Sequence, residues 1–317
     1  MWSYAIRRIL VAIVLVWVVA TIVFSILYLI PGDPAELLSS SGGMLPPPEA
    51  VAAMRAEMGL DRPILDQYGA FLAGILRGDL GRSFQDGYPI SAEIATRLPR
   101  TIELILAATL LALATGLPLG AVAARRQGGA LDRVLSALAS LQLSMPVFVI
   151  GTLLILLFAQ TLRWVPAGGY VAFAQDPVRH LVHLSMPAFT IAVGLSATVF
   201  RMARASIIET LGRDWVRTAR AKGLSRGRVM RAHVVRNALG PVATVVGLSV
   251  GTLLGGTVLI EYVFNWPGLS GFLVSAVEQR DYPAVRGIVL VISFLFILIN
   301  LGVDLLYALL DPRIRHG

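Results

Sequence analysis

The sequence has no cysteine among its 317 residues, and charged residues make up only 15% of it. The absence of cysteine excludes disulfides and thiol chemistry and leaves the cellular compartment open. The scarcity of charge, combined with 56% hydrophobic residues, excludes an ordinary soluble domain, in which about 25% of residues are charged. The composition therefore predicts an integral membrane protein.

Motifs for nucleotide and metal chemistry are also missing. There is no Gly-x-x-x-x-Gly-Lys-Ser/Thr loop, so we expect this chain to bind no nucleoside triphosphate. His180 and His183 have a spacing that can chelate a metal, but no Cys and no His-Glu-x-x-His accompanies them. A role at the membrane interface is the alternative for this pair. We expect no catalytic residue, no bound cofactor and no bound metal.

Long uncharged runs are what the sequence does contain. Each is near the roughly 20 residues that cross a hydrocarbon core. A bilayer offers no water to backbone groups, so such runs form helices. We therefore predict an all-α membrane protein with six transmembrane helices at 9–30, 99–124, 133–162, 183–204, 237–260 and 285–310.

The basic residues predict the orientation of these spans, because short cytoplasmic loops collect Lys and Arg. Seventeen of the 27 basic residues fall on the side that holds both termini. We therefore place both termini in the cytoplasm of a multi-pass protein of the plasma membrane. The predicted cytoplasmic segments are 1–8, 125–132, 205–236 and 311–317, and the predicted external segments are 31–98, 163–182 and 261–284.

The external segment 31–98 carries nine acidic and five basic residues and is long for a simple loop. Pro48 can begin a helix that Gly59 ends, Asp61 can cap a second helix that reaches about Arg77, and Ser91 a third, short one before Pro99. These signals predict a small helical insertion over the outer face. A passive spacer is the alternative.

Residues 201–236 carry ten basic residues against Glu209 and Asp214. No stacking platform of aromatic residues or nucleic-acid module accompanies them, so we expect no nucleic acid as a partner. The stretch from Asp214 to Ser225 is the candidate contact surface for another protein. Gly223 can end a helix in a left-handed conformation, and Ser225 can cap the next helix.

Polar residues at membrane depth need partners. Asp304 lies one helical turn after Asn300. We expect Asp304 to pair with Arg201 or Arg204 in a structural role; a proton relay is the alternative, but no chain of such groups is visible. Glycines at four-residue spacing predict close helix packing, either within one subunit or between subunits: Gly116 and Gly120, and Gly247, Gly251 and Gly255. Prolines 118, 146 and 187 can kink the second, third and fourth spans.

Over almost its whole length the chain resembles the first permease subunit of dipeptide, oligopeptide and nickel importers of the ATP-binding-cassette (ABC) superfamily, with the type I fold. Six blocks in order carry this resemblance: Leu29-Ile30-Pro31-Gly32-Asp33-Pro34, Gly78-Asp79-Leu80-Gly81-Arg82-Ser83, Val216-Arg217-Thr218-Ala219-Arg220-Ala221-Lys222-Gly223, Glu261-Tyr262-Val263-Phe264-Asn265-Trp266-Pro267-Gly268, Arg280-Asp281-Tyr282-Pro283 and Asp304-Leu305-Leu306-Tyr307-Ala308-Leu309-Leu310-Asp311-Pro312-Arg313.

In that superfamily a short helix with the motif Glu-Ala-Ala-x-x-x-Gly docks in a groove of the ATPase subunit. Here Arg217 and Thr218 stand in place of Glu and the first Ala, whereas Ala219 and Gly223 match, and a later Pro of the motif falls at Arg236. The resemblance implies that the following residues couple the chain to an ATPase: Asp214, Trp215, Arg217, Thr218, Ala219, Lys222, Gly223 and Leu224.

The resemblance also implies partners. These are a second homologous permease subunit, two ATPase subunits or domains that hold ATP and Mg, an extracytoplasmic substrate-binding protein, and membrane lipid. Peptides are the expected cargo, with glutathione, nickel complexes and haem left open. Two rival classes remain: a secondary transporter, which would show inverted repeats and a buried set of carboxylates, and a structural or sensory membrane protein.

Overall fold

The computed structural model describes residues 2–29, 35, 47–57 and 59–310. Expectations for residues 31–34, for the Ser/Gly/Pro stretch up to Pro46 and for the tail 311–317 with Arg313 and Arg315 lie outside the described residues. Within those residues every regular element is a helix.

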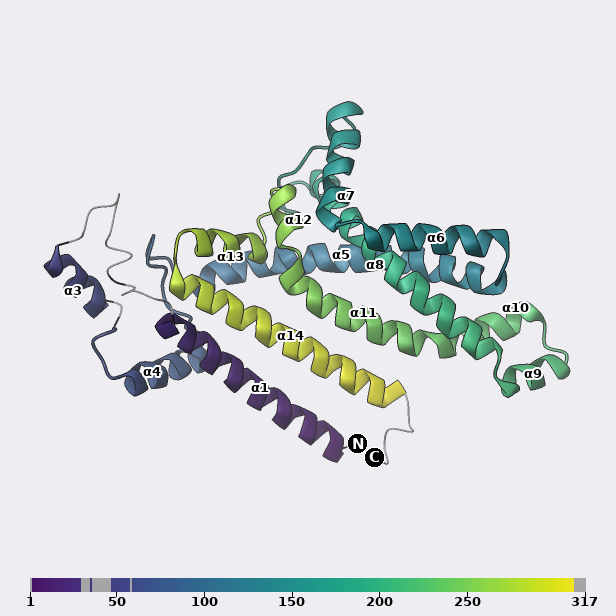
Figure 1. Ribbon diagram of the computed structural model, residues 1–317, viewed down its shortest axis with the longest axis horizontal. Coiled ribbons are helices and arrows are strands. Elements are labelled where there is room, and N and C mark those ends of the chain that lie inside the picture. Colours follow the sequence, from purple (N-terminus) through teal and green to yellow (C-terminus); the bar gives the residue numbers. More distant parts are fainter. Residues whose placement is uncertain (1, 30–34, 36–46, 58, 311–317) are drawn as a thin grey trace.

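Five long helices are apolar enough to cross a membrane. Helix α1 lies beside α14, α14 beside α11, α11 beside α8, and α8 beside α5, and Figure 1 shows α1, α14 and α11 as neighbouring ribbons. With the bent pair described below as one span, the count is six, which confirms the predicted all-α membrane fold. The five helices are α1 (Trp2–Leu29), α5 (Ile90–Arg125), α8 (Pro177–Leu211), α11 (Arg236–Gly256) and α14 (Tyr282–Leu310).

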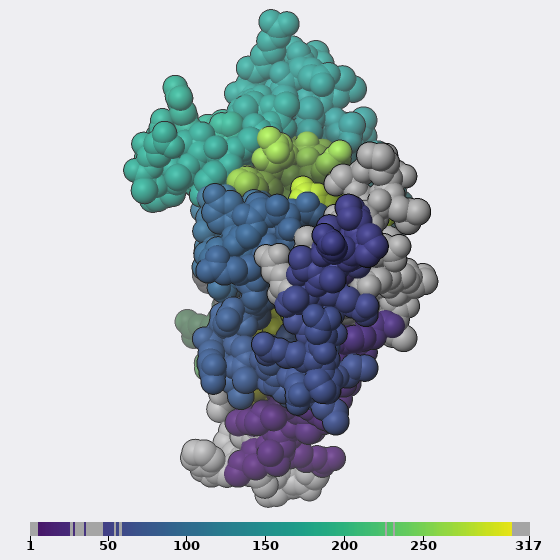
Figure 2. Space-filling view, turned by 90° about the vertical axis from the view of Figure 1, so that its left-hand side faces the viewer, coloured from purple at the N-terminus to yellow at the C-terminus, as the bar shows by residue number. Residues whose placement is uncertain are grey.

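The span predicted as one helix over 133–162 is broken in two. The first part is helix α6 (Ala130–Ser144). The second part is α7 (Val147–Leu154), which continues as the π-helical turn η1 (Ile155–Thr161). The two parts meet at an angle of 99°. Met145 is extended, with φ −92° and ψ 129°, because a residue before proline is disfavoured in the helical region. The kink that Pro146 permits is therefore a full break, after which α7 packs on α8 and α12 (Val258–Val263) and belongs to the teal end of the molecule in Figure 2.

Helix α5 begins at Ile90 and runs through Pro99. The predicted separate helix from Ser91 was therefore wrong. Ile90 and Ile94 are buried in a cluster with Leu269 and Ile288, and this packing on α13 (Leu269–Glu278) and α14 keeps the chain in line despite the proline. A helix of 36 residues is about 54 Å long, so α5 extends beyond the hydrocarbon core.

The predicted helical insertion is present as α3 (Pro48–Glu57) and α4 (Ile64–Arg77). Helix α4 begins after Pro63, so the expected cap at Asp61 was wrong: proline at this point already sets an extended backbone. Its end at Gly78, with φ 74°, is as predicted. The hydroxyl groups of Thr21 and Tyr68 are 2.7 Å apart, which ties α4 to α1.

Close glycine packing occurs within this one chain. A Cβ at Gly116 would lie 2.7 Å from the carbonyl oxygen of Ser196, and one at Gly120 would lie 2.9 Å from that of Phe200. The two glycines therefore let α5 and α8 approach backbone to backbone. Gly247 and Gly251 likewise face α14, whereas a Cβ at Gly255 would meet nothing within 4 Å.

Candidate functional site

Helix α9 (Asp214–Ala221) lies between the end of α8 and a short helical stretch that leads into α11. This stretch consists of α10 (Arg226–Arg228) and the π-helical turn η2 (Val229–Val235). Figure 1 shows α9 and α10 beyond the ends of α8 and α11, at the end of the molecule away from α13. Helix α9 is therefore linked to α8 on one side and, through α10 and η2, to α11 on the other.

One face of α9 is anchored in a small apolar core. Val216 is fully buried in a cluster with Ile207 on α8 and Val229 and Val234 on η2. Ala219 and Leu224 are half-buried against the same cluster. The spacing of Val216 and Ala219 puts both on one side of the helix, so the element is held by its own subunit along that side.

The opposite face of α9 is open to a partner. The side chains of Asp214, Trp215, Arg217, Thr218 and Lys222 are exposed. Trp215 is 41% exposed although it is large and apolar, and its ring centroid lies 6.4 Å from that of His233 on η2. The exposed indole and the basic side chains around it suit a partner surface with an apolar pocket and carboxylates.

Gly223 ends α9 in the left-handed conformation, with φ 81°, as predicted. Its N–H donates to the carbonyl of Arg220 at 2.9 Å, and the N–H of Leu224 donates to the carbonyl of Ala219 at 3.3 Å. This is the Schellman arrangement. Ser225 directly precedes α10, and its carbonyl accepts from the N–H groups of Arg228 and Val229. The chain therefore leaves α9 along a defined path.

The predicted polar cluster is split between two places. Asp304 pairs with Arg8 at 2.8 Å, so the expected pairing with Arg201 or Arg204 was wrong. The reason is the arrangement of the helices, since α1 and not α8 contacts α14 along its length. Asn300 donates to the carbonyl of Phe296 within the same helix, and Arg201 is exposed with no ion pair among the described residues.

Arg204 has a different carboxylate. Its Nε and Nη2 atoms donate to the two oxygens of Asp132 at 2.6 and 2.8 Å. Asp132 is buried in the first turn of α6 and also accepts from the N–H of Gly128. This bidentate ion pair fixes the α5–α6 turn on α8. Arg204 lies seven residues before α8 ends at Leu211. Sequence reasoning missed Asp132, although an acidic residue at the start of a span was a usable signal.

The two histidines have separate environments. Both ring nitrogens of His180 have protein partners: the carbonyl of Val171 at 2.7 Å and Glu103 at 2.6 Å. Nδ1 of His183 has no hydrogen-bond partner in the described part of the structure. No group of three or more metal-ligating side chains occurs in the described part of the chain.

Residues of three of the resemblance blocks are structural at the end opposite α9. Glu261 is buried on α12 (Val258–Val263) and accepts from the hydroxyl of Thr101 at 2.7 Å and the N–H of Gly271 at 2.9 Å. Burial raises the pKa of the Glu261 carboxyl, and these hydrogen bonds oppose the rise. Asp281 accepts from the hydroxyl of Ser83. The Asp281 contact therefore ties the loop before α5 to the residue that precedes α14, and the Glu261 contacts tie α12 to α5 and α13.

Comparison with known proteins gives the chain its family. Residues 116–316 match the family described as binding-protein-dependent transport system inner membrane component, and residues 1–105 match the N-terminal family of the same systems. The dipeptide transport system permease protein DppB of Escherichia coli K12 is 38% identical, with 100% of this chain and 99% of the relative covered. A putative peptide transport system permease protein of Brucella abortus is 40% identical, with both chains covered completely.

Solved structures support the same fold. The inward-facing methionine ABC transporter MetNI matches with a TM-score of 0.58 and 16% identity, covering 69% of this chain and 96% of the matched chain. An amino acid ABC transporter crystallised with histidines matches with a TM-score of 0.51 and 17% identity, covering 70% and 94%. With full-length relatives at 38% and 40% identity, the chain belongs to the family of inner membrane components of binding-protein-dependent transport systems.

Proposed function

We propose that this chain is one of two membrane subunits of an ATP-driven importer for peptides, and that α9 transmits ATPase closure to its spans. The arrangement of α9 carries the proposal. Its inner side is anchored by Val216 and its outer side is exposed. Because its inner side packs on α8 and η2, a displacement of α9 would move these two elements with it. The eight residues predicted for coupling all lie in or directly after α9.

Peptide cargo is supported by what the relatives are called, since the Escherichia coli and Brucella abortus proteins are dipeptide and peptide transport permeases. A second permease subunit would complete the path, and two ATPase subunits or domains would supply ATP and Mg. A binding protein would deliver the peptide to the outer face. We place both termini in the cytoplasm, with α9 on the same side and α3 and α4 outside.

Uptake by cells tests the cargo. A strain deleted for this gene should lose accumulation of a labelled dipeptide and regain it when the gene is restored. Labelled nickel chelate and haem are assayed in parallel in the same strain. Loss of nickel or haem uptake with normal dipeptide uptake would contradict the peptide assignment and leave the importer assignment standing.

A further inference from the structure

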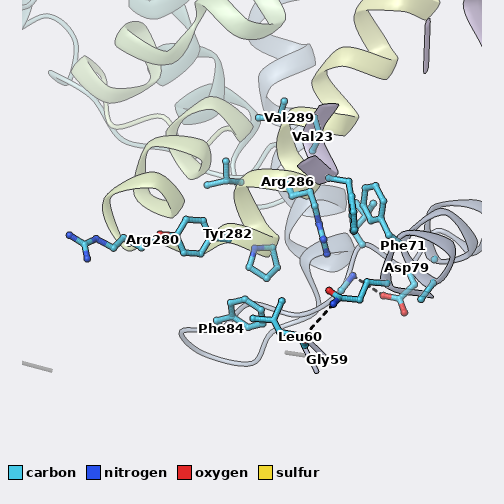
Figure 3. A pocket seen from close by; sticks show the side chains of 18 of the residues that line it. Val23, Gly59, Leu60, Phe71, Asp79, Phe84, Arg280, Tyr282, Arg286 and Val289 are labelled. Carbon is cyan, nitrogen blue, oxygen red and sulfur yellow. Dashed lines mark hydrogen bonds between the residues drawn. The ribbon is translucent and has the colours of Figure 1, made fainter. Parts of the chain in front are cut away.

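A cavity of about 520 Å³ lies between α1, α4, the loop before α5 and the start of α14. Figure 3 shows it from close by. Its walls are largely apolar and include Val23 and Phe24 from α1, Phe71 from α4, and Val285 and Val289 from α14. It is far from α9, so the coupling role does not account for it.

The charge in this cavity is unbalanced. Its lining carries three arginines, Arg62, Arg280 and Arg286, against one acidic residue, Asp79. Asp79 already accepts a hydrogen bond from the N–H of Gly81 at 2.9 Å. Arg280 points away from the other labelled side chains in Figure 3, whereas Arg286 points toward Phe71.

The guanidinium of Arg286 lies against an aromatic ring and not against a carboxylate of the described residues. Its central carbon lies 4.6 Å from the centroid of the Phe71 ring. Among the described residues no acidic side chain forms an ion pair with it, and no hydrogen bond from it to a protein acceptor occurs. The Tyr28 hydroxyl on α1 is committed to Gln67 Oε1, to which it donates at 2.5 Å.

A cation in this position is costly without a partner. Arg286 lies in the first turns of α14, within the apolar stretch Tyr282–Leu305, where an unpaired charge is unfavourable. The aromatic ring covers one face of the guanidinium. The N–H groups at the edge of the guanidinium are left to bind a ligand, and their planar fork geometry matches the oxygens of a phosphate.

The surroundings point to a phosphate that carries apolar chains. The two helices that line the cavity also have exposed apolar side chains: Ile22 on α1 is 55% exposed, and Leu65 and Leu76 on α4 are 81% and 89% exposed. Apolar side chains exposed next to a spanning helix are covered by lipid. A lipid tail can therefore pass from the cavity onto the face of α1.

We propose that this cavity binds one phospholipid, with its phosphodiester on Arg286 and the upper part of an acyl chain along Phe24, Phe71 and Val289. The lipid would join α4 to α1 and α14 and so fix the insertion on the spans. With the topology proposed above, this lipid would lie in the outer leaflet. The binding of a phospholipid in the cavity does not depend on that topology.

Native mass spectrometry of the transporter purified with its partner subunits tests this site. Phosphatidylglycerol or phosphatidylethanolamine is added back after delipidation, and lipid retained per complex is counted for the wild type, Arg286→Gln and Arg179→Gln. Arg179 is an exposed arginine at the start of α8 and serves as the matched charge control. We expect Arg286→Gln to retain at least tenfold less lipid and Arg179→Gln to match the wild type.

Two further arms keep the proposal open to refutation. Ala70→Phe fills the cavity from α4 and keeps Arg286. It should also lower lipid retention. This variant tests the proposal if Arg286→Gln does not fold. Millimolar inorganic phosphate distinguishes the source of the anion. Equal lipid retention by Arg286→Gln and the wild type, or complete displacement of the lipid by inorganic phosphate, would overturn the proposal.

Discussion

Two buried carboxylates at opposite ends of the molecule have different tasks. Asp132 has a permanent cation in Arg204 and holds the α5–α6 turn on α8. Glu261 has hydroxyl and N–H donors but no cationic partner among the residues described, and it joins α12 to Thr101 on α5. The first therefore stabilises the arrangement near α9, and the second the arrangement at the other end.

Asp132→Ala should destabilise the chain, because it leaves the guanidinium of Arg204 without its carboxylate. Removal of one partner of a buried pair costs about 3 kcal/mol. The expected result is a lower midpoint of thermal unfolding in detergent. The exposed pair Arg217 and Asp214 provides the control, since loss of a surface pair costs about 1 kcal/mol or less. Equal effects of Asp132→Ala and Asp214→Ala would contradict the structural role.

Glu261 should give stability a pH dependence. Burial raises its pKa above the usual 4.5, so the folded chain holds this proton more tightly than the unfolded chain does. Its contribution is then fully present below about pH 4.5 and is lost as pH rises through the folded pKa. Glu261→Gln should remove this part of the dependence. Unfolding midpoints of both proteins across pH measure it, and parallel curves would refute the assignment.

At the scale of elements, the stability of α9 depends on its packing and on how it ends. The helix has eight residues, too few to be stable by itself. Its inner side rests on Val216 and its end on Gly223. The end at Gly223 was predicted from the sequence, whereas the burial of Val216 was not.

Gly223→Val should impair coupling. A β-branched residue at φ 81° costs about 1 to 3 kcal/mol in backbone strain and would redirect the chain after α9. We expect less peptide transported per ATP hydrolysed, or loss of ATPase from the purified complex. Gly227→Val is the matched control, because Gly227 lies four residues further on in α10, has no positive φ, and a Cβ there meets nothing within 4 Å. Normal transport by Gly223→Val would exclude the coupling role.

The angle between α6 and α7 could not be predicted from the sequence. Pro146 indicated a kink, but the 99° angle depends on what α7 packs against, and this includes Phe264 beside Gly151. Likewise, Asp304 was identified as a residue that needs a cation. Its partner Arg8 could not be found, because the order of helices in the bundle is a tertiary property. The spans themselves were predictable because their length and lack of charge are set by the bilayer.

For the whole molecule, the family membership means that the chain works with ATPase and binding-protein partners at the inner membrane. The charge distribution gives its orientation as an expectation. Exposed basic residues gather around α9, whereas the opposite end carries α3, α4 and α13.

The absence of cysteine makes this orientation directly testable. Single cysteines at Thr218 on α9 and at Ala174, both exposed, should label differently with a membrane-impermeant maleimide. We expect Ala174→Cys to react in spheroplasts and Thr218→Cys only after permeabilisation. The reverse pattern would invert the topology and place α9 on the wrong side for an ATPase.

The most direct test of the whole account is ATP hydrolysis by the purified transporter, assembled from this chain, its second permease subunit and its ATPase subunits in lipid. Hydrolysis is measured with the binding protein, with dipeptides, and with both together. The account predicts stimulation only when both are present, and its loss in Gly223→Val but not in Gly227→Val. Hydrolysis that ignores peptide and binding protein, or that is unchanged in Gly223→Val, would contradict it.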